Sequence, residues 1–218
     1  MINLPKKKDG KPYLSYSQIS VWKKSKNRRN YIRQYFLGEE EDNASLKDYA
    51  DFGNKVGEAL ENNDFSKFTE EEQKFLKTVP RYDEFEREVV LDMVDFFMKG
   101  FIDTNSLSSK GRVDIIVDYK TGIIEKVIPK YEGDDYLQTD IYSAAIEQET
   151  GHLPKEAKVI IIQRDGNAFN GELLTLGDNY HIVEREVSRE RIDKVLKNIR
   201  EIAEEISLYY SVFLKLNQ

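Results

Sequence analysis

The segment VDIIVDYKTG, Val113–Gly122, constrains the fold of this chain more than any other part of the sequence. Its alternation predicts a β-strand, whose side chains point in turn to two faces. One face is apolar and is expected to pack into a core; it carries Val113, Ile115, Val117 and Tyr119. The other face carries Asp114, Ile116, Asp118 and Lys120. The strand therefore ends with a carboxylate and an ammonium near buried surface, where charges are costly without partners. A metal ion and a phosphate would supply such partners.

Three helices are predicted before this strand, after an extended, mobile lead-in over residues 1–13. Ser15 or Ser17 can cap the first helix, and Gly38 ends it. Thr69 and Glu72 form a capping-box pattern at the start of the third. The three helices are expected over about residues 15–36, 46–62 and 69–78.

The hydrophobic period then changes to that of strands. Three strands separated by short polar turns predict an antiparallel meander, over residues 85–94, 96–103 and 112–120. Next come a helix over 136–150, a strand over 158–164, one or two short strands up to 187, and a helix over about 189–214. The fourth strand is almost continuously apolar, as expected for a strand covered on both faces. The order of elements predicts an α/β fold with a central mixed β-sheet flanked by helices.

A chain of 218 residues is long enough for one well-buried domain. We expect a single domain with three parts: a basic N-terminal arm and helix over residues 1–45, a core over 46–165, and C-terminal strands with a long helix over 166–218.

Positive charge is concentrated at the N-terminus. Residues 1–33 hold ten basic side chains and one acid, a net charge of +9, so the other 185 residues carry −16 of the total of −7. A basic arm on an acidic body suits local contact with phosphates, although a solvated helix face would give the same pattern. The candidates for DNA contact are Lys23, Lys24, Lys26, Arg28, Arg29 and Arg33.

The chain contains no cysteine. This excludes disulfides, thiolate catalysis and a cysteine-bound iron–sulfur cluster, and it fits a cytoplasmic location, which is the host cytoplasm if a phage encodes the chain. There is also no run of about 18 apolar residues and no secretion signal, so no contact with a membrane is expected.

Asp103, at the end of the second meander strand, has an uncertain relation to Asp118. If the two strands are antiparallel neighbours joined by residues 104–111, Asp103 should lie toward the start of the next strand. A twisted or bulged strand would bring the two carboxylates together, and strand alternation alone leaves the pairing open.

Gln138 and Tyr142 are four residues apart on a predicted helix and therefore share a face. Facing the sheet, such a pair can orient a water molecule or hold a phosphate. An ordinary amphipathic helix would show the same spacing.

In combination, these motifs resemble the PD-(D/E)XK nuclease superfamily, in its RecB-like exonuclease branch. Gly100-Phe101-Ile102-Asp103, followed by Asp118-Tyr119-Lys120-Thr121-Gly122, resembles the catalytic core of that branch. The resemblance extends over about residues 14–165 and includes the segment starting at Leu14, the Phe52-Gly53-x-x-x-Gly57 pattern and Gln138-x-x-x-Tyr142. It implies a fold with a restriction-endonuclease-like core.

The resemblance also implies roles for these residues. Asp103, Asp118 and the backbone carbonyl of Tyr119 would bind Mg²⁺ or Mn²⁺, which prefer oxygen ligands. Lys120 would orient or deprotonate the attacking water and stabilise charge on the phosphate. Gln138 and Tyr142 would belong to the catalytic set.

The sequence departs from the family pattern in its helical motif. Many RecB-like nucleases carry a histidine where this chain has Gly57. Glu61, one turn further along, shares a face with Gly53 and Gly57, and two glycines would let that helix approach the site closely. We therefore expect Glu61 to replace the histidine as a ligand in preference to Glu58, which points about 100° away on a helix of 3.6 residues per turn.

The function that these features predict is a metal-dependent deoxyribonuclease. An exonuclease acting on single- or double-stranded DNA in recombination, repair or replication is the first hypothesis, with a protein from those processes as a partner to be sought. The alternatives are a nuclease fold that binds DNA or protein without effective catalysis, because the histidine is missing, and a structure-specific endonuclease. Oligomeric state and the polarity of cleavage are not readable from the sequence.

Overall fold

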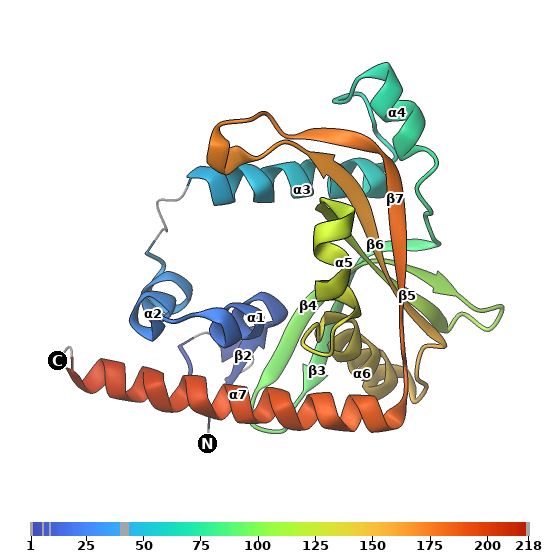
Figure 1. Ribbon diagram of the computed structural model, residues 1–218. Coiled ribbons are helices and arrows are strands. Elements are labelled where there is room, and N and C mark those ends of the chain that lie inside the picture. The colour runs from blue at the N-terminus through green and yellow to red at the C-terminus, as the bar shows by residue number, and fades with distance from the viewer. Residues whose placement is uncertain (1, 6, 9, 40–43, 217–218) are drawn as a thin grey trace.

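The computed structural model describes residues 2–5, 7–8, 10–39 and 44–216 (Figure 1). These residues form a seven-stranded mixed sheet in the order β1-β2-β4-β5-β6-β7, with β3 pairing to β4. The strands are β1 (Lys7–Lys8), β2 (Lys11–Ser15), β3 (Glu84–Asp92), β4 (Phe97–Leu107), β5 (Val113–Gly122), β6 (Glu156–Asp165) and β7 (Thr175–Arg185). The predicted α/β class with a central mixed sheet is confirmed.

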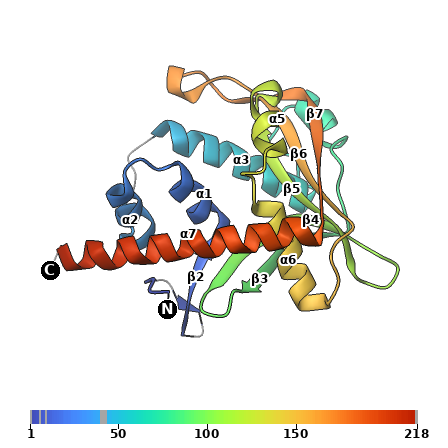
Figure 2. The same cartoon turned by 60° about the horizontal axis from the view of Figure 1, so that its bottom comes forward.

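Helices cover both faces of the sheet. They are α1 (Tyr16–Lys24), α2 (Arg28–Leu37), α3 (Ala44–Asn62), α4 (Glu70–Leu76), α5 (Ile124–Glu132), α6 (Gln138–Thr150) and α7 (Arg189–Leu216), and a short 3-10 helix, η1 (Ala168–Asn170), lies in the β6–β7 connection. One core joins α1, α2, α6 and α7 to the sheet, and a second joins α3 and α4 to the opposite face. Figure 2 shows α7 running past α1, α2 and α6.

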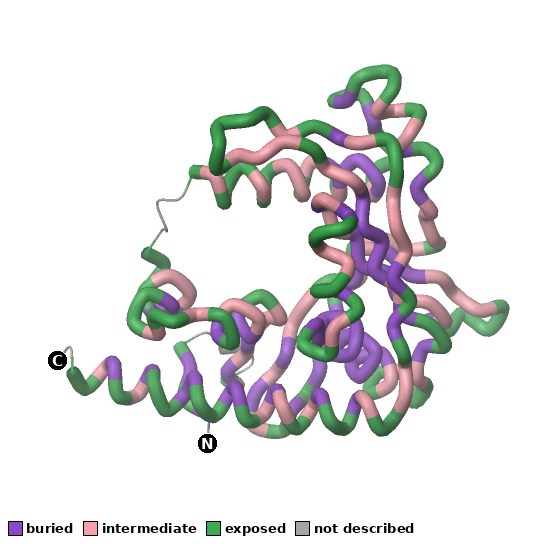
Figure 3. Tube along the Cα trace, viewed as in Figure 1, coloured by how far each residue is buried: buried purple, intermediate pink, exposed green. Residues whose placement is uncertain are grey.

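The strand β6 lies at the centre of these layers. Val159 and Ile161 pack with the core of α5, whereas Ile160 and Ile162 pack with the core of α3 and α4. All four side chains are fully buried, in the central region that Figure 3 colours purple. The expectation of a strand covered on both faces is therefore confirmed.

The predicted helix over residues 15–36 is wrong in one respect, because the chain breaks between α1 and α2. Ser15 caps α1 with a full capping box. At the break, Ser25 is extended, and its N–H donates to the carbonyls of Val21 and Trp22. Asn27 then caps α2 by accepting from the N–H of Asn30. Asparagine and serine compete with helix continuation in this way because their short side chains bond to nearby backbone groups.

The lead-in and the strand ends also differ from expectation. Residues Lys11–Ser15 form β2, which extends the sheet parallel to β4, and Leu14 anchors it in the core. Residues 1, 6 and 9 of the predicted lead-in lie outside the described residues. The strand β4 continues four residues past Asp103, to Leu107. The sequence did not predict α5, which contains Pro129.

Within the described part of the chain, no helix is long and apolar enough to cross a membrane.

Candidate active site

The strands β4 and β5 separate at the site. Their antiparallel ladder runs from Leu107↔Val113 only as far as Thr104↔Val117. Beyond that point β4 pairs with β2, while β5 pairs with β6 through Gly122. Asp103 and Asp118 therefore lie at the fork. We call this place the β4–β5 fork.

The fork brings Asp103 beside β5, a pairing that strand alternation left open. The N–H of Tyr119 donates to Asp103 Oδ2 over 2.6 Å, in place of a ladder bond to β4. In an extended strand the N–H and C=O of one residue point to the same side, as in residue pairs that exchange both bonds. The carbonyl of Tyr119 therefore points toward Asp103 as well.

Asp118 is fully buried beside the fork. Its Oδ2 lies 2.6 Å from Lys120 Nζ and accepts a 2.6 Å hydrogen bond from the hydroxyl of Tyr136. Its Oδ1 is also buried but has no hydrogen-bond partner among the described residues. An orphaned carboxylate oxygen in the interior is costly, so the site has room for one more positive group or donor.

Gln138 and Tyr142 lie behind Asp118 rather than in the open site. Gln138 Nε2 donates to the Tyr142 hydroxyl over 2.8 Å, and Gln138 Oε1 lies 3.2 Å from the Tyr136 hydroxyl. Both side chains are buried. They form the end of a chain of polar contacts that leads through Tyr136 to Asp118. Tyr142 also explains Gly100, since a Cβ there would lie 2.6 Å from the Tyr142 ring.

The loop that carries Tyr136 is held by two arginines that sequence reasoning missed. Arg185 is buried, and its guanidinium donates to the carbonyls of Tyr131, Gly133 and Tyr136 over 2.5, 3.2 and 3.1 Å. Arg191 binds both oxygens of Asp140, at the start of α6, over 2.7 and 3.0 Å. Nothing in the strand-like or helical periodicity around these arginines distinguishes them from surface residues.

The charged groups at the fork shift one another's pKa. Partial burial and repulsion from Asp118 raise the pKa of Asp103 to about 7, although Lys120 acts in the opposite direction. Burial lowers the pKa of Lys120, but the attraction of Asp118 and Asp103 outweighs it, so the pKa lies above its ordinary value. Lys120 is therefore a firmly protonated ammonium, and the two carboxylates together still carry unmet negative charge.

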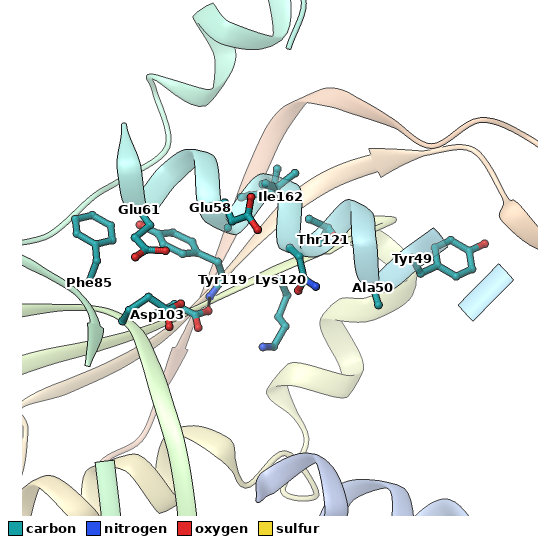
Figure 4. Close-up of a pocket in the computed structure, with 15 residues that line it drawn as sticks. Tyr49, Ala50, Glu58, Glu61, Phe85, Asp103, Tyr119, Lys120, Thr121 and Ile162 are labelled. Carbon is teal, nitrogen blue, oxygen red and sulfur yellow. Dashed lines mark hydrogen bonds between the residues drawn. The ribbon is translucent and has the colours of Figure 1, made fainter. Parts of the chain in front are cut away.

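A pocket of about 590 Å³ opens from the fork toward α3 (Figure 4). Asp103 and Lys120 line its inner end, and Tyr49 lies at its outer end. Glu61 and Glu58 both line the pocket. Glu61 is half-buried and projects toward Asp103 in Figure 4, whereas Glu58 is exposed and pairs with Lys67 over 3.5 Å.

The two glycines of α3 do not serve the close approach expected of them. A Cβ at Gly53 would make an ordinary 3.6 Å contact with Thr121 Oγ1, and a Cβ at Gly57 would meet nothing within 4 Å. Gly57 therefore leaves the pocket open rather than drawing the helix nearer. That expectation was wrong because it assumed a neighbour that the fold does not provide.

Glu86 is a further acidic residue of this pocket that the sequence did not reveal. It lies on β3 between the pairs Phe85↔Thr104 and Arg87↔Ile102, hence opposite Asp103. Its φ is +51°, which is uncommon for a residue other than glycine. Its burial and the neighbouring Glu61 raise its pKa. The strand pattern around it gives no signal of this, because the unusual backbone is a property of the folded sheet.

The donor set at the fork fits a hard divalent cation. Two carboxylates, one of them with an unpartnered oxygen, and the Tyr119 carbonyl on the side of Asp103 are the ligand types that Mg²⁺ and Mn²⁺ prefer. The described residues contain no ready-made group of three acidic or histidine side chains around one point. A third protein ligand, such as Glu61, would have to approach when a cation binds.

The basic residues predicted to contact DNA fall into two groups, those that pair with an acidic side chain and those that do not. Lys23 pairs with Asp135, Arg28 pairs with Glu205, and Arg33 pairs with Glu39. The remaining three, Lys24, Lys26 and Arg29, are exposed and have no acidic partner within the described ranges.

Comparisons with known proteins concern the family and the fold. The sequence matches the family model of the PD-(D/E)XK nuclease superfamily over residues 23–211. Its structure is similar to that of a protein described as "Putative exonuclease" from Eubacterium rectale, with a TM-score of 0.50 and 14% sequence identity. That similarity covers 91% of this chain and 82% of the other, and at such identity it concerns the fold alone. No curated protein matches the sequence.

Proposed function

Because the chain belongs to the PD-(D/E)XK nuclease superfamily, we propose that it hydrolyses DNA phosphodiester bonds at the β4–β5 fork, with a divalent metal ion. The observation that carries this proposal is that Asp103, Asp118 and Lys120 lie together at the fork, where one oxygen of Asp118 is buried and has no hydrogen-bond partner among the described residues. Such an arrangement is unfavourable in the isolated protein and becomes favourable when a cation and a phosphate bind.

Asp103, Asp118 and the Tyr119 carbonyl are the proposed ligands of Mg²⁺ or Mn²⁺. Such an ion lowers the pKa of a bound water and neutralises charge that develops on the phosphate. The raised pKa of Asp103 supports this assignment, because a cation would relieve the repulsion from Asp118 that helps to raise it. Glu61 is the proposed additional acid, ahead of Glu58, since it is nearer to Asp103 in the pocket.

Lys120 acts as a cation in this proposal rather than as a base. Its raised pKa keeps the ammonium protonated at neutral pH, so it can hold a phosphate oxygen and stabilise the charge that forms there. Gln138 and Tyr142 act through Tyr136, and they keep Asp118 in place without touching the substrate.

The preference for DNA ends is the finer part of the proposal. It rests on the resemblance of the motifs to RecB-like nucleases and on a structurally similar protein that is described as an exonuclease. A role in recombination, repair or replication follows from the same resemblance.

The test is a digestion of end-labelled single- and double-stranded DNA in Mg²⁺ or Mn²⁺, beside covalently closed circles. We expect degradation of linear DNA and intact circles. Cleaved circles would establish an endonuclease instead. Asp114→Asn is the matched control for Asp118→Asn, because Asp114 lies on the same strand but pairs with Lys155 outside the site.

A second candidate is a nuclease fold that binds nucleic acid without cleaving it. Among the described residues, no three acidic or histidine side chains are grouped so that they could hold a metal ion together, and this favours the second candidate. Calorimetric titration with Mn²⁺ separates the two, since a binding module with a degraded site would take up no metal at millimolar concentration.

A further inference from the structure

A second cavity lies next to the fork, on the side of α1 and α5. Its volume is about 390 Å³, and its walls include Ser20 and Lys24 of α1, Lys130 at the end of α5, and Tyr136. The Tyr136 hydroxyl donates to Asp118 on the fork side. One side chain therefore separates this cavity from the proposed metal ligands.

The two acids on the cavity wall are engaged elsewhere. Asp134 pairs with Arg191 over 2.8 Å and lies 3.8 Å from Lys194, and Asp135 pairs with Lys23. Their negative charge is met by cations that do not line the cavity.

The two lysines on the wall have no such compensation. Within the described ranges, neither Lys24 nor Lys130 has an acidic side chain within 4 Å. Lys130 Nζ lies 3.2 Å from the Tyr131 hydroxyl and 4.6 Å from the centre of the Tyr131 ring. Burial and repulsion from Lys24 and Lys120 lower the pKa of Lys130, and these effects outweigh the attraction of Asp118. The cavity therefore has an excess of positive charge that an anion would balance.

We propose that this cavity binds a phosphate group of the nucleic-acid strand through Lys24 and Lys130. This phosphate neighbours, on the same strand, the phosphate held at the β4–β5 fork. The proposal rests on the proposed function, since the fork supplies the neighbouring phosphate. Lysine binds phosphate as a compact point charge and needs no fixed approach direction, which suits two lysines that reach one cavity from different helices. Ser20 places a hydroxyl on the same wall.

This site would explain how the basic N-terminal segment acts. Of the six basic residues predicted to contact DNA, only Lys24 lines this cavity or the fork pocket. The phosphate can come from within the strand or from its end. A terminal phosphate would place the scissile bond next to a strand terminus, whereas an internal phosphate would set only the register of the strand.

The experiment measures binding without cleavage. A fluorescent single-stranded oligonucleotide is titrated in EDTA over a range of salt concentrations, using wild-type protein, the double variant Lys24→Ala/Lys130→Ala, and the control Lys77→Ala. Lys77 is an exposed lysine at the end of α4 that lines neither cavity. We expect the double variant to bind about tenfold more weakly, with the slope of log K against log salt reduced by roughly 1. Lys77→Ala should keep the wild-type slope.

A second arm uses chemically altered strands and identifies the phosphate. Oligonucleotides carrying one neutral methylphosphonate at successive positions, or a terminal hydroxyl in place of a terminal phosphate, are compared on both proteins. Wild-type binding should weaken at one position, and the double variant should be indifferent to that same change, as for two groups that interact. Loss at an end phosphate identifies a terminal site, and loss at an inner position identifies an internal one.

Equal sensitivity of wild-type and double-variant protein at every position would overturn the proposal. The cleavage assay keeps this result separate from the proposed function. If the protein cleaves DNA but the lysine variants bind DNA as the wild type does, the nuclease proposal stands and this phosphate site does not. Lysine-dependent binding without any cleavage would support the site and contradict catalysis.

Discussion

Asp118 and Asp103 meet at one fork but are held in different ways. Asp118 is fully buried, and its Oδ2 contacts Lys120, on the same strand, and Tyr136, just before α6. Asp103 is only half-buried, is held by the Tyr119 N–H, and faces an open pocket lined by acids. One carboxylate is thus positioned by buried partners, while the other is held by a backbone N–H against the repulsion of its neighbour.

Removing either carboxylate should have the largest effect on activity. We expect Asp118→Asn, Asp103→Asn and Lys120→Ala each to reduce metal-dependent cleavage by at least about 10²- to 10³-fold, the range for losing one electrostatic group of an active site. Steady-state digestion of labelled DNA measures this, with Asp114→Asn as control. Near-wild-type cleavage by all three variants would contradict the assignment of the site.

The two carboxylates should differ in their effect on stability. Asp103→Asn removes a source of repulsion, so its thermal midpoint in EDTA should equal or exceed that of the wild type. It should also lose most of the stabilisation that Mn²⁺ gives the wild-type protein. Thermal melts with and without metal test both statements.

The positioning of Asp118 can be broken without touching either carboxylate. Tyr136→Phe removes the hydroxyl that donates to Asp118, so we expect about 10- to 100-fold lower activity, as for other residues that orient metal ligands. Tyr119→Phe is the matched control, because its hydroxyl donates to Pro80 over the same 2.6 Å on the other face of β5. It should cost stability, by about 1 kcal/mol for one hydrogen bond, and leave kcat near the wild-type value. Equal activity losses in both variants would contradict a specific role for Tyr136.

The pH dependence should report the state of Asp103. Its pKa of about 7 in the folded protein exceeds the value of about 3.9 for a free aspartate. Between these values the folded state binds the extra proton, so this group makes the metal-free protein less stable as pH rises from about 4 to about 7. Metal binding requires the deprotonated form, so Mn²⁺ affinity should fall about tenfold for each pH unit below 7.

Calorimetric titration with Mn²⁺ at pH 6, 7 and 8 measures this dependence. Asp103→Asn should abolish the loss of stability of the metal-free protein with rising pH. It should also abolish the pH-dependent part of the Mn²⁺ affinity. An affinity that does not change between pH 6 and pH 7 would contradict the assignment of Asp103 as a ligand.

The smallest effect concerns the acids on α3. We expect Glu61→Gln to weaken Mn²⁺ binding several-fold, because Glu61 is half-buried and projects toward Asp103. Glu58→Gln should leave it unchanged, since Glu58 is exposed and pairs with Lys67. The reverse order of effects would reassign the ligand. Glu86→Gln, at the opposite wall, shows whether a third acid shares the site.

The features readable from the sequence all depend on local spacing. Strand alternation places Asp118 and Lys120 together at the end of β5. The short, almost continuously apolar segment of β6 predicts a strand that is buried on both faces. The capping box of Thr69 and Glu72 marks the start of α4 correctly. Such patterns are reliable because a residue's face is set by its neighbours along the chain.

Only the tertiary structure decided the other features of the site, because these features depend on pairing between segments that are distant in the sequence. Asp103 reaches β5 because β4 runs on to Leu107 and turns tightly, a length that no local pattern fixes. The left-handed backbone of Glu86 and the two arginines behind Tyr136 arise from the assembled sheet. The same holds for charge: all six predicted basic residues look alike in the sequence, and only the fold shows which of them pair with acids and which one lines a cavity. The sequence by itself thus determined which groups could do the chemistry, whereas the fold determined which of them meet.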